Sequence, residues 1–278
     1  MIPRLSLLDW QEKIQWPSME QIEQDLILSR IIVDIYNNPF LKEHLVFRGG
    51  MALNKLFISP AARYSEDVDL VQIKAGPIGP LIHELRNTLS PWLGKAKWKL
   101  SAGRATLYHK FTTESDGRQI RLKIEINTRE HFHHFDLPEI AYNIENPWFT
   151  GNAQIKTYAL EELMGTKLRA LYQRKKGRDL FDLFTVLNTN PSLNCQHIID
   201  CFHIYMKHEN LYISKAEYQM NIAEKLEDEI FLKDITPFLR LGHVYDSIEA
   251  YTLMEEKLIH LLAGDPWKKR DKGMGLAL

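Results

Sequence analysis

The residues of this sequence with the clearest chemical potential are two aspartates in the segment Asp67-Val68-Asp69. In a β-strand, side chains at positions i and i+2 point to the same face, so the two carboxylates would project together. Hard oxygen ligands suit Mg²⁺, which proteins usually bind through one or two carboxylates together with phosphate and water. Mn²⁺ accepts the same ligands. The pair therefore predicts a divalent-metal site.

A pair of glycines, Gly49 and Gly50, precedes the aspartates, with Gly50 seventeen positions before Asp67. The glycines follow a predicted strand over residues 44–47 and precede a predicted short helix over residues 51–57. Glycine lets the backbone approach a ligand closely, and a helix N-terminus offers unpaired NH groups to a phosphate. An Asp-x-Asp segment alone more often marks a solvated strand edge or turn than a metal site. After a strand, a glycine pair and a helix, it instead predicts a phosphoryl-transfer site.

A third carboxylate, Glu125, lies on a predicted strand between Ile124 and Ile126. Alternation along the strand places Glu125 on the face opposite its apolar neighbours. It either faces the same site as a third metal ligand or faces solvent.

A second set of charged residues lies much later in the chain and comprises Lys167, Arg174, Arg178, Asp179 and Asp182. On one continuous helix the three basic residues would form a cationic stripe able to hold a triphosphate, unless Gly177 ends that helix first. Asp179 and Asp182 would be neighbours on a helix, one a general base and the other an arginine partner. Taken alone, such mixed charge favours a solvated helix with ion pairs over a nucleotide site.

The elements that must position these residues change along the chain. Helical periodicity after a Ser18 N-cap predicts a helix over residues 18–38 that ends at Asn37-Asn38-Pro39. Further strands are expected at 68–73, 98–100, 105–111 and 119–127, with a helix at 77–89 and a turn at Ser115-Asp116-Gly117. From Ala159 onward helical periodicity dominates, with little strand signal beyond a short piece near Ile155. We therefore expect an α+β protein with a mixed-sheet lobe at residues 1–155 and a helical lobe at residues 156–278.

The overall composition narrows the class of protein. The chain has 278 residues, 45% of them apolar, and a net charge of -1 from 35 basic and 36 acidic side chains. A nucleic acid would thus have to bind a local basic patch. Two cysteines six positions apart, Cys195 and Cys201, favour free thiols, and no signal segment or membrane span is visible, so we expect a cytoplasmic protein. We expect the basic tail, residues 267–272, to be a solvated terminus.

Four blocks of this sequence together resemble the AbiEii/AbiGii (MenT-like) toxin family of nucleotidyltransferases, within the polymerase-β-like superfamily. The blocks are Phe-Arg-Gly-Gly-Met-Ala-Leu-Asn-Lys from Phe47, Arg-Tyr-Ser-Glu-Asp-Val-Asp-Leu from Arg63, Lys-Ile-Glu-Ile from Lys123, and the segment from Lys167 to Leu183. The resemblance covers residues 47–183 and implies a bilobed protein whose helical lobe closes a nucleotide cleft.

The resemblance also implies residue roles. Asp67 and Asp69 inherit the metal-ligand role, Lys167 a role in triphosphate binding, and Asp182 a role in catalysis. Arg174 and Arg178 match by residue type and are expected to help bind the nucleotide. Met51 departs from the family pattern, in which a small hydroxyl residue commonly follows the glycines, so only backbone groups would meet phosphate at that step.

The function implied is metal-dependent transfer of a nucleoside monophosphate from an NTP to an acceptor, with the tRNA 3′ end as the expected acceptor and a block of translation as the result. A cognate antitoxin, often a winged-helix transcription factor, is expected to be encoded beside such a toxin. Two alternatives stay open. One is transfer to a protein or small molecule, and the other is a catalytically silent module that only binds nucleotide.

Overall fold

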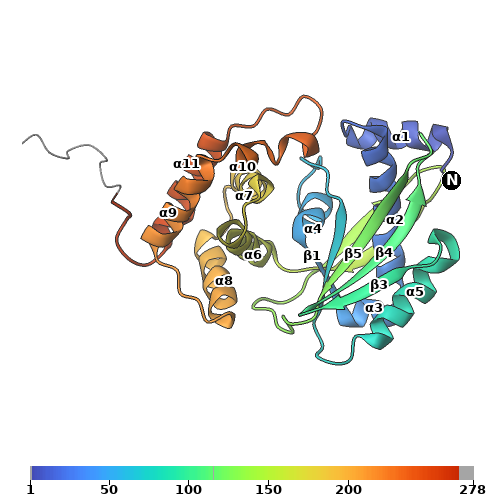
Figure 1. Ribbon diagram of the computed structural model, residues 1–278, viewed down its shortest axis with the longest axis horizontal. Helices are drawn as coiled ribbons and strands as arrows, with labels where there is room; N and C mark the ends of the chain where they lie inside the picture. The colour runs from blue at the N-terminus through green and yellow to red at the C-terminus, as the bar shows by residue number, and fades with distance from the viewer. Residues whose placement is uncertain (1, 115, 269–278) are drawn as a thin grey trace, which may run out of the picture. The chain divides into compact units, whose positions relative to one another are not determined.

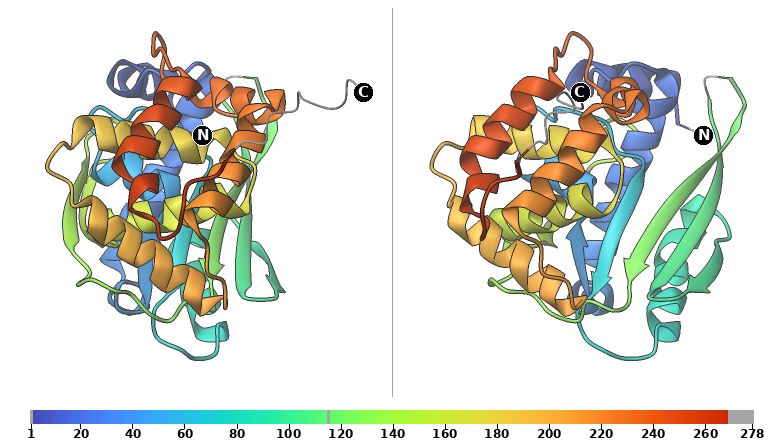
Figure 2. Two further views of the ribbon diagram at one scale, coloured as in Figure 1. Left: turned by 90° about the vertical axis from the view of Figure 1, so that its left-hand side faces the viewer. Right: turned by 60° about the vertical axis from the view of Figure 1, so that its left-hand side comes forward.

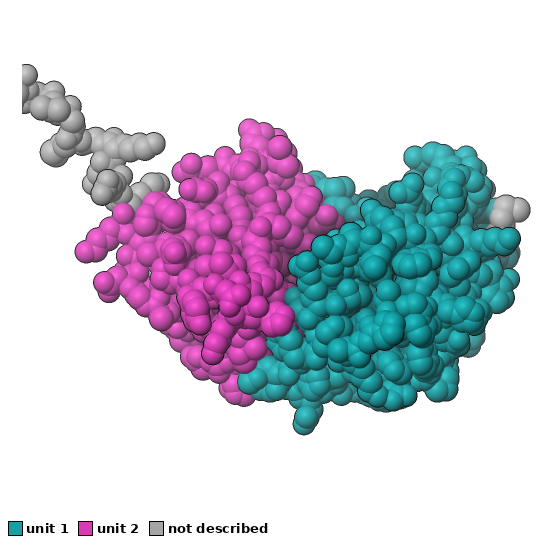
Figure 3. Space-filling view, turned by 60° about the horizontal axis from the view of Figure 1, so that its bottom comes forward, with its two compact units in different colours: residues 1–163, 236–244 teal, residues 164–235, 245–278 magenta. Residues whose placement is uncertain are grey.

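The computed structural model describes residues 2–114 and 116–268, which form two compact units (Figure 3). The first unit comprises residues 1–163 and 236–244, and the second comprises residues 164–235 and 245–278. Ser115 of the predicted turn and residues 269–272 of the predicted tail lie outside the described residues.

The first unit contains a five-stranded sheet, a two-stranded hairpin and several helices (Figure 1). Its strands are β1 (Leu45–Arg48), β2 (Asp67–Gln72), β3 (Lys97–Ser101), β4 (Arg104–Thr112), β5 (Gln119–Asn127), β6 (Glu139–Ile144) and β7 (Gly151–Lys156). Its helices are α1 (Arg4–Ile14), α2 (Met19–Asn37), α3 (Pro39–His44), α4 (Gly49–Leu56), α5 (Gly79–Leu93), the start of α6 (Leu160–Gln173) and the 3-10 helix η1 (Thr236–Phe238).

The five strands lie in the order β1-β2-β5-β4-β3. Strand β2 pairs parallel with β5, whereas the other three neighbouring pairs are antiparallel. Strands β4 and β5, drawn in green in Figure 2, form a long antiparallel hairpin. The predicted mixed sheet is thus confirmed, and the predicted strands match β1 to β5 to within a few residues.

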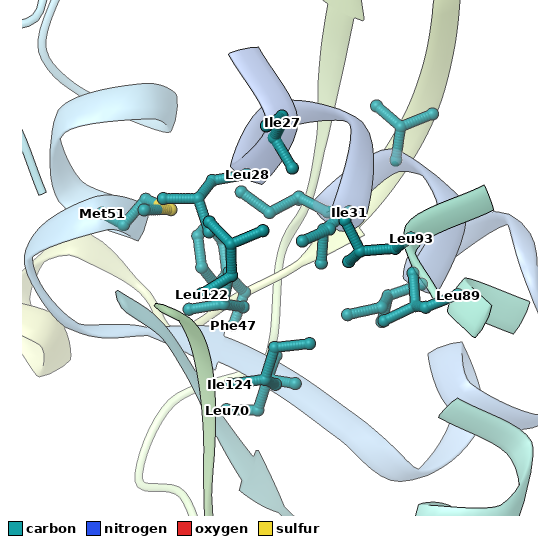
Figure 4. Close-up of a cluster of buried hydrophobic side chains, with 14 of the residues drawn as sticks. Ile27, Leu28, Ile31, Phe47, Met51, Leu70, Leu89, Leu93, Leu122 and Ile124 are labelled. Atoms are coloured by element: carbon teal, nitrogen blue, oxygen red, sulfur yellow. The ribbon is translucent and has the colours of Figure 1, made fainter. Parts of the chain in front are cut away.

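The core of the first unit lies between one face of this sheet and helices α2 and α5 (Figure 4). Ile27 and Ile31 of α2 and Leu89 of α5 meet Leu122 and Ile124 of β5 there, and all of them are fully buried. The alternation of β5 leaves its polar residues on the opposite face. One face of the sheet therefore packs against helices, while the opposite face presents polar side chains that are available for a functional site.

Local sequence signals account for the helix boundaries. Ser18 accepts a hydrogen bond from the backbone N–H of Gln21 and Gln21 accepts one from the backbone of Ser18, so a capping box starts α2 as predicted. Helix α2 ends at Asn37, also as predicted. The segment after it is not a simple stop, because Asn38 caps a new helix in which Pro39 fits the first turn.

The second unit is helical, as predicted for the later part of the chain. It contains the rest of α6, α7 (Gly177–Thr189), α8 (Cys195–His208), α9 (Lys215–Leu226), α10 (Glu229–Lys233), α11 (Ser247–Lys257) and the 3-10 helix η2 (Ile259–Leu261). Gly165 lets α6 approach α8 closely, since an added Cβ would lie 2.5 Å from Cβ of Cys201. The two cysteines are free thiols. Within the described residues, no helix combines the length and apolar character needed to cross a membrane.

Candidate active site

The glycine pair lies at the junction of β1 and α4, and Gly49 touches the aspartate pair. Gly49 has φ +79°, a backbone conformation that side chains with a Cβ rarely adopt. A Cβ on Gly49 would lie 2.4 Å from Oδ2 of Asp69. Glycine is therefore required at position 49 for two reasons: the positive φ, and the lack of space for a Cβ beside Asp69. Met51, two residues after Gly49, is buried in the core (Figure 4), so its side chain is directed away from any phosphate at the turn.

Gly50 is required by a different neighbour, the guanidinium group of Arg63. An added Cβ on Gly50 would lie 2.0 Å from Nη2 of Arg63, which is itself buried. Asn54 of α4 holds this segment in place, because its Oδ1 accepts hydrogen bonds from the backbone N–H groups of Ala62 and Arg63 at 3.1 and 3.2 Å. The loop that leads into β2 is thus tied to the helix that follows the glycines.

Asp67 and Asp69 project from the same face of β2 toward β5, where Lys123 and Glu125 occupy the facing positions. The register pairs Asp67 with Lys123 and Asp69 with Glu125. Glu125 therefore lies on the same sheet face as the aspartates, and its side chain is 17% exposed. Nζ of Lys123 lies 2.9 Å from Oδ2 of Asp67 and 3.0 Å from Oε1 of Glu125. Arg104 of β4 reaches the same oxygen of Glu125 at 3.3 Å.

The negative charge of these carboxylates raises the pKa of two basic residues, Lys123 and Arg48. Partial burial opposes the charge of Lys123, but its hydrogen bonds and proximity to Asp67 and Glu125 outweigh that effect and raise its pKa. Burial likewise opposes the charge of Arg48, yet Glu130, which it contacts at 2.5 Å, and the nearby Asp69 raise the pKa of Arg48. The face around the aspartates is therefore built to hold cations.

The chemistry of the donor set fits a divalent cation. Among the described residues, no three acidic, histidine or cysteine side chains converge in a ready-made metal cluster. The two aspartates nevertheless share one strand face, and the Lys123 ammonium group already stands between Asp67 and Glu125 as a cation. Mg²⁺ needs only one or two carboxylates when substrate phosphate and water complete its shell, so these residues can hold it.

The helical unit brings four of the predicted residues together. Lys167 of α6 lies 3.1 Å from Asp179 and 2.7 Å from Asp182, both on α7. Arg174 donates two hydrogen bonds to Asp179, at 2.7 and 2.8 Å. Burial alone would raise the pKa of Asp179, but Lys167 and Arg174 outweigh it and hold that pKa well below its ordinary value. Asp179 is thus an arginine partner, as one of the two aspartates was expected to be.

The continuous cationic stripe does not form, and the alternative of a break holds. Helix α6 ends at Gln173 and α7 begins at Gly177, where a Cβ would lie 2.2 Å from the carbonyl oxygen of Phe231. Arg178 therefore belongs to a different helix from Lys167, and its Nε lies 3.5 Å from Asp234. Gly177 is therefore the first residue of α7 and does not end α6. Glycine is needed there because a Cβ has no room beside Phe231.

Several solved structures have folds similar to that of this chain. The nucleotidyltransferase toxin MenT4 from Mycobacterium tuberculosis is 13% identical with a TM-score of 0.60, and the match covers 93% of this chain and 88% of MenT4. A putative nucleotidyltransferase from Helicobacter pylori is 18% identical with a TM-score of 0.57, covering 88% and 95%. JHP933 from Helicobacter pylori gives 18% and 0.55, covering 88% and 92%. At this identity the likeness shows the fold, which is that of a nucleotidyltransferase.

The sequence itself assigns the family. The family model described as nucleotidyl transferase AbiEii toxin, type IV toxin-antitoxin system, matches residues 30–251. The chain therefore belongs to the AbiEii nucleotidyltransferase toxin family, which confirms the resemblance read from its motifs. Membership makes it an enzyme that takes an NTP and implies an antitoxin as a partner. No curated protein matches the sequence significantly.

Three residues of the site, Lys123, Arg63 and Asn54, are not among the site residues predicted from the sequence. Lys123 lies two positions before Glu125, so strand alternation puts both on one face, and that signal was available. Arg63 and Asn54 lie within recognised motifs, but their contacts depend on how the loop at residues 57–66 returns to α4. The path of this loop does not follow from any periodic pattern of apolar residues in the sequence.

Proposed function

We propose that this protein is a Mg²⁺-dependent nucleotidyltransferase toxin that transfers a nucleoside monophosphate from an NTP to the 3′ end of tRNA and thereby blocks translation. The observation that carries the proposal is the position of Asp67 and Asp69, side by side on one strand face and next to the glycine turn. Mn²⁺ would serve in place of Mg²⁺ at the same oxygen ligands.

A basic surface on the same sheet face supports a nucleic acid as the acceptor. Moving from β5 to the edge strand β3, the register places on that face Arg121, Tyr108, Lys110, Arg104, Lys97 and Lys99. The charged groups of Lys99 and Arg121 lie 5.6 and 5.1 Å from the ring of Tyr108. Basic side chains contact phosphates, and an aromatic ring can stack on an unpaired base, as single-stranded RNA ends require. A local patch of this kind fits a chain with a net charge of -1.

The proposed roles in the first unit follow from its contacts. Asp67 and Asp69 would hold the metal ion, with Glu125 as a third ligand. Bound there, the metal would neutralise the triphosphate and stabilise the charge that develops on the transferred phosphoryl group. Gly49 and Gly50 would let the backbone at the start of α4 approach the phosphates.

The proposed roles in the second unit start from the buried contact between Lys167 and Asp182. Lys167 would bind the triphosphate, and Asp182 would accept or orient the proton of the attacking hydroxyl group. Oδ2 of Asp182 already forms an ion pair with Nζ of Lys167 at 2.7 Å. We therefore propose that Lys167 exchanges Asp182 for phosphate when nucleotide binds, which frees the carboxylate. Arg174 would fix Asp179 throughout, and Arg178 would add positive charge for the nucleotide.

The acceptor is tested by incubating the protein with each α-phosphate-labelled NTP, Mg²⁺ and total RNA. We expect label on tRNA. A charge-reversed variant carrying Lys99→Glu and Arg121→Glu should have a KM for RNA raised at least about tenfold, with a nearly unchanged KM for the NTP, because several phosphate contacts are lost. Lys207→Glu, an exposed lysine on α8, is the matched control and should behave as wild type.

Two outcomes would reject the RNA acceptor. Label on protein or on a small molecule, with none on RNA, would identify a different acceptor class. A silent nucleotide-binding module would give no label at all, and its effect on cells would survive Asp69→Asn.

The antitoxin is proposed to be encoded next to this toxin. The gene neighbourhood checks this directly: a neighbouring gene whose product relieves the toxicity of this chain is the expected result.

A further inference from the structure

Lys123 holds a position that a metal ion would need. Its ammonium group lies 2.9 Å from Asp67 and 3.0 Å from Glu125, the first and third of the proposed metal ligands. The side chain comes from β5, whose residue 123 is directly opposite Asp67 in the parallel register. This contact is therefore set by the strand pairing and not by a chance surface encounter.

An ammonium group and a divalent cation cannot both use these oxygens. Mg²⁺ binds carboxylate oxygens at about 2.0–2.1 Å, so it would lie within a few ångströms of Nζ, where like charges repel strongly in a partly buried site. The flexible stem of a lysine allows its charged group to move elsewhere. Lys123 must turn away before a metal ion enters.

We infer that Lys123 is a resident counter-cation that competes with the metal ion for Asp67 and Glu125 in the nucleotide-free protein. Its ammonium group prevents free divalent ions from binding these carboxylates. The ammonium group leaves them only when another anion is available to it. An incoming triphosphate supplies that anion, so metal and nucleotide enter together. The inference rests on the proposed metal site and goes beyond it by giving Lys123 a positioning role.

The experiment measures Mn²⁺ binding to the purified full chain without nucleotide, by electron paramagnetic resonance of the free ion. The variant is Lys123→Met, which keeps the length of the side chain and removes the charge. Its matched control is Arg121→Met on the same strand and face, because the Arg121 guanidinium group lies over Tyr108. A nearby charge commonly shifts the affinity of a carboxylate for a proton by about one to three pKa units. We therefore expect Lys123→Met to bind Mn²⁺ at least about tenfold more tightly than wild type, and Arg121→Met to stay within about twofold.

A thermal readout guards against a folding defect. Without metal, Lys123→Met should have a lower Tm than wild type, because the carboxylates lose their counter-cation. Mn²⁺ should then raise its Tm by more than it raises that of wild type, as tighter binding to the folded state requires. Lys123→Gln serves as a second uncharged variant and should show the same two effects.

The outcomes separate this inference from the metal site itself. If wild type binds Mn²⁺, Asp69→Asn abolishes the binding, and the Lys123 variants bind no more tightly than wild type, the inference is overturned and the metal site stands. An equal gain in the Arg121 control also overturns it, since general electrostatics would then explain the effect. If no form of the protein binds Mn²⁺, both the inference and the metal-dependent mechanism are overturned.

Discussion

Replacing Lys167 with methionine should destabilise the helical unit measurably, apart from any effect on activity. The Lys167 side chain is 7% exposed and contacts two fully buried carboxylates, Asp179 and Asp182. Removing one partner of a buried ion pair typically costs about 3–5 kcal/mol, because the remaining charge stays buried. Arg174 still holds Asp179 through two hydrogen bonds, which favours the lower end, about 3 kcal/mol.

The assay is thermal and urea unfolding of the full chain. At about 2–4 °C per kcal/mol, a loss of about 3 kcal/mol lowers the Tm by about 6–12 °C. Lys175→Met is the control, because Lys175 is half exposed and pairs with Asp228 at the surface, where such pairs contribute about 0–1 kcal/mol. Adding Asp182→Leu to Lys167→Met should restore part of the stability, since an apolar pair replaces a broken ion pair.

A Lys167→Met protein as stable as wild type would refute this reasoning. It would mean that the lysine does not neutralise the two aspartates in the folded protein. The measurement also guides the interpretation of activity data, because a loss of transfer in a variant with lowered Tm cannot be assigned to catalysis alone.

Three further predictions follow from single contacts. Gly49→Ala should lower the Tm and abolish nucleotidyl transfer, because its positive φ costs about 1–2 kcal/mol and its Cβ would strike Asp69; Gly79→Ala, with no atom within 4 Å of an added Cβ, is the control for both assays. The pKa of Asp179 is lower in the folded than in the unfolded state, so as pH falls the unfolded chain is protonated at this residue before the folded protein is. The free energy of unfolding should therefore fall as pH decreases below about 4, and urea unfolding of Asp179→Asn should depend less on pH in this range. Burial lowers the pKa of His109, so stability should also fall as pH decreases below about 6.5, and His109→Phe should remove that part of the pH dependence measured by urea unfolding.

Local patterns predicted those parts of the fold that local chemistry determines. The Ser18 capping box starts α2, and the alternation of β5 puts Glu125 on its polar face. The hairpin of β6 and β7 was harder to foresee, because β6 in particular has few fully buried positions and only a short strand signal near Ile155 was visible. Helix α1 gave no clear signal either, and its apolar residues include the exposed Leu5.

The candidate site was only partly predictable, for reasons of topology. The motifs located Asp67 and Asp69, but the contact of Asp67 with Lys123 needs β2 to pair parallel with β5, and no residue pattern states which strands are neighbours. The contacts of Lys167 likewise depend on the turn between α6 and α7, which brings Asp179 and Asp182 to it. Residue types could be foreseen from sequence, while their partners could not.

The measurement that tests the central claim most directly is the position of the transferred nucleotide on RNA. Wild-type protein and Asp69→Asn, matched with Asp136→Asn as an exposed-carboxylate control, are incubated with labelled NTPs, Mg²⁺ and purified tRNA, and the product ends are sequenced. We predict labelled nucleotide at the tRNA 3′ end for wild type and the control, and none for Asp69→Asn. Folded wild-type protein that adds no nucleotide to any tRNA, with any of the NTPs, would contradict the proposed function.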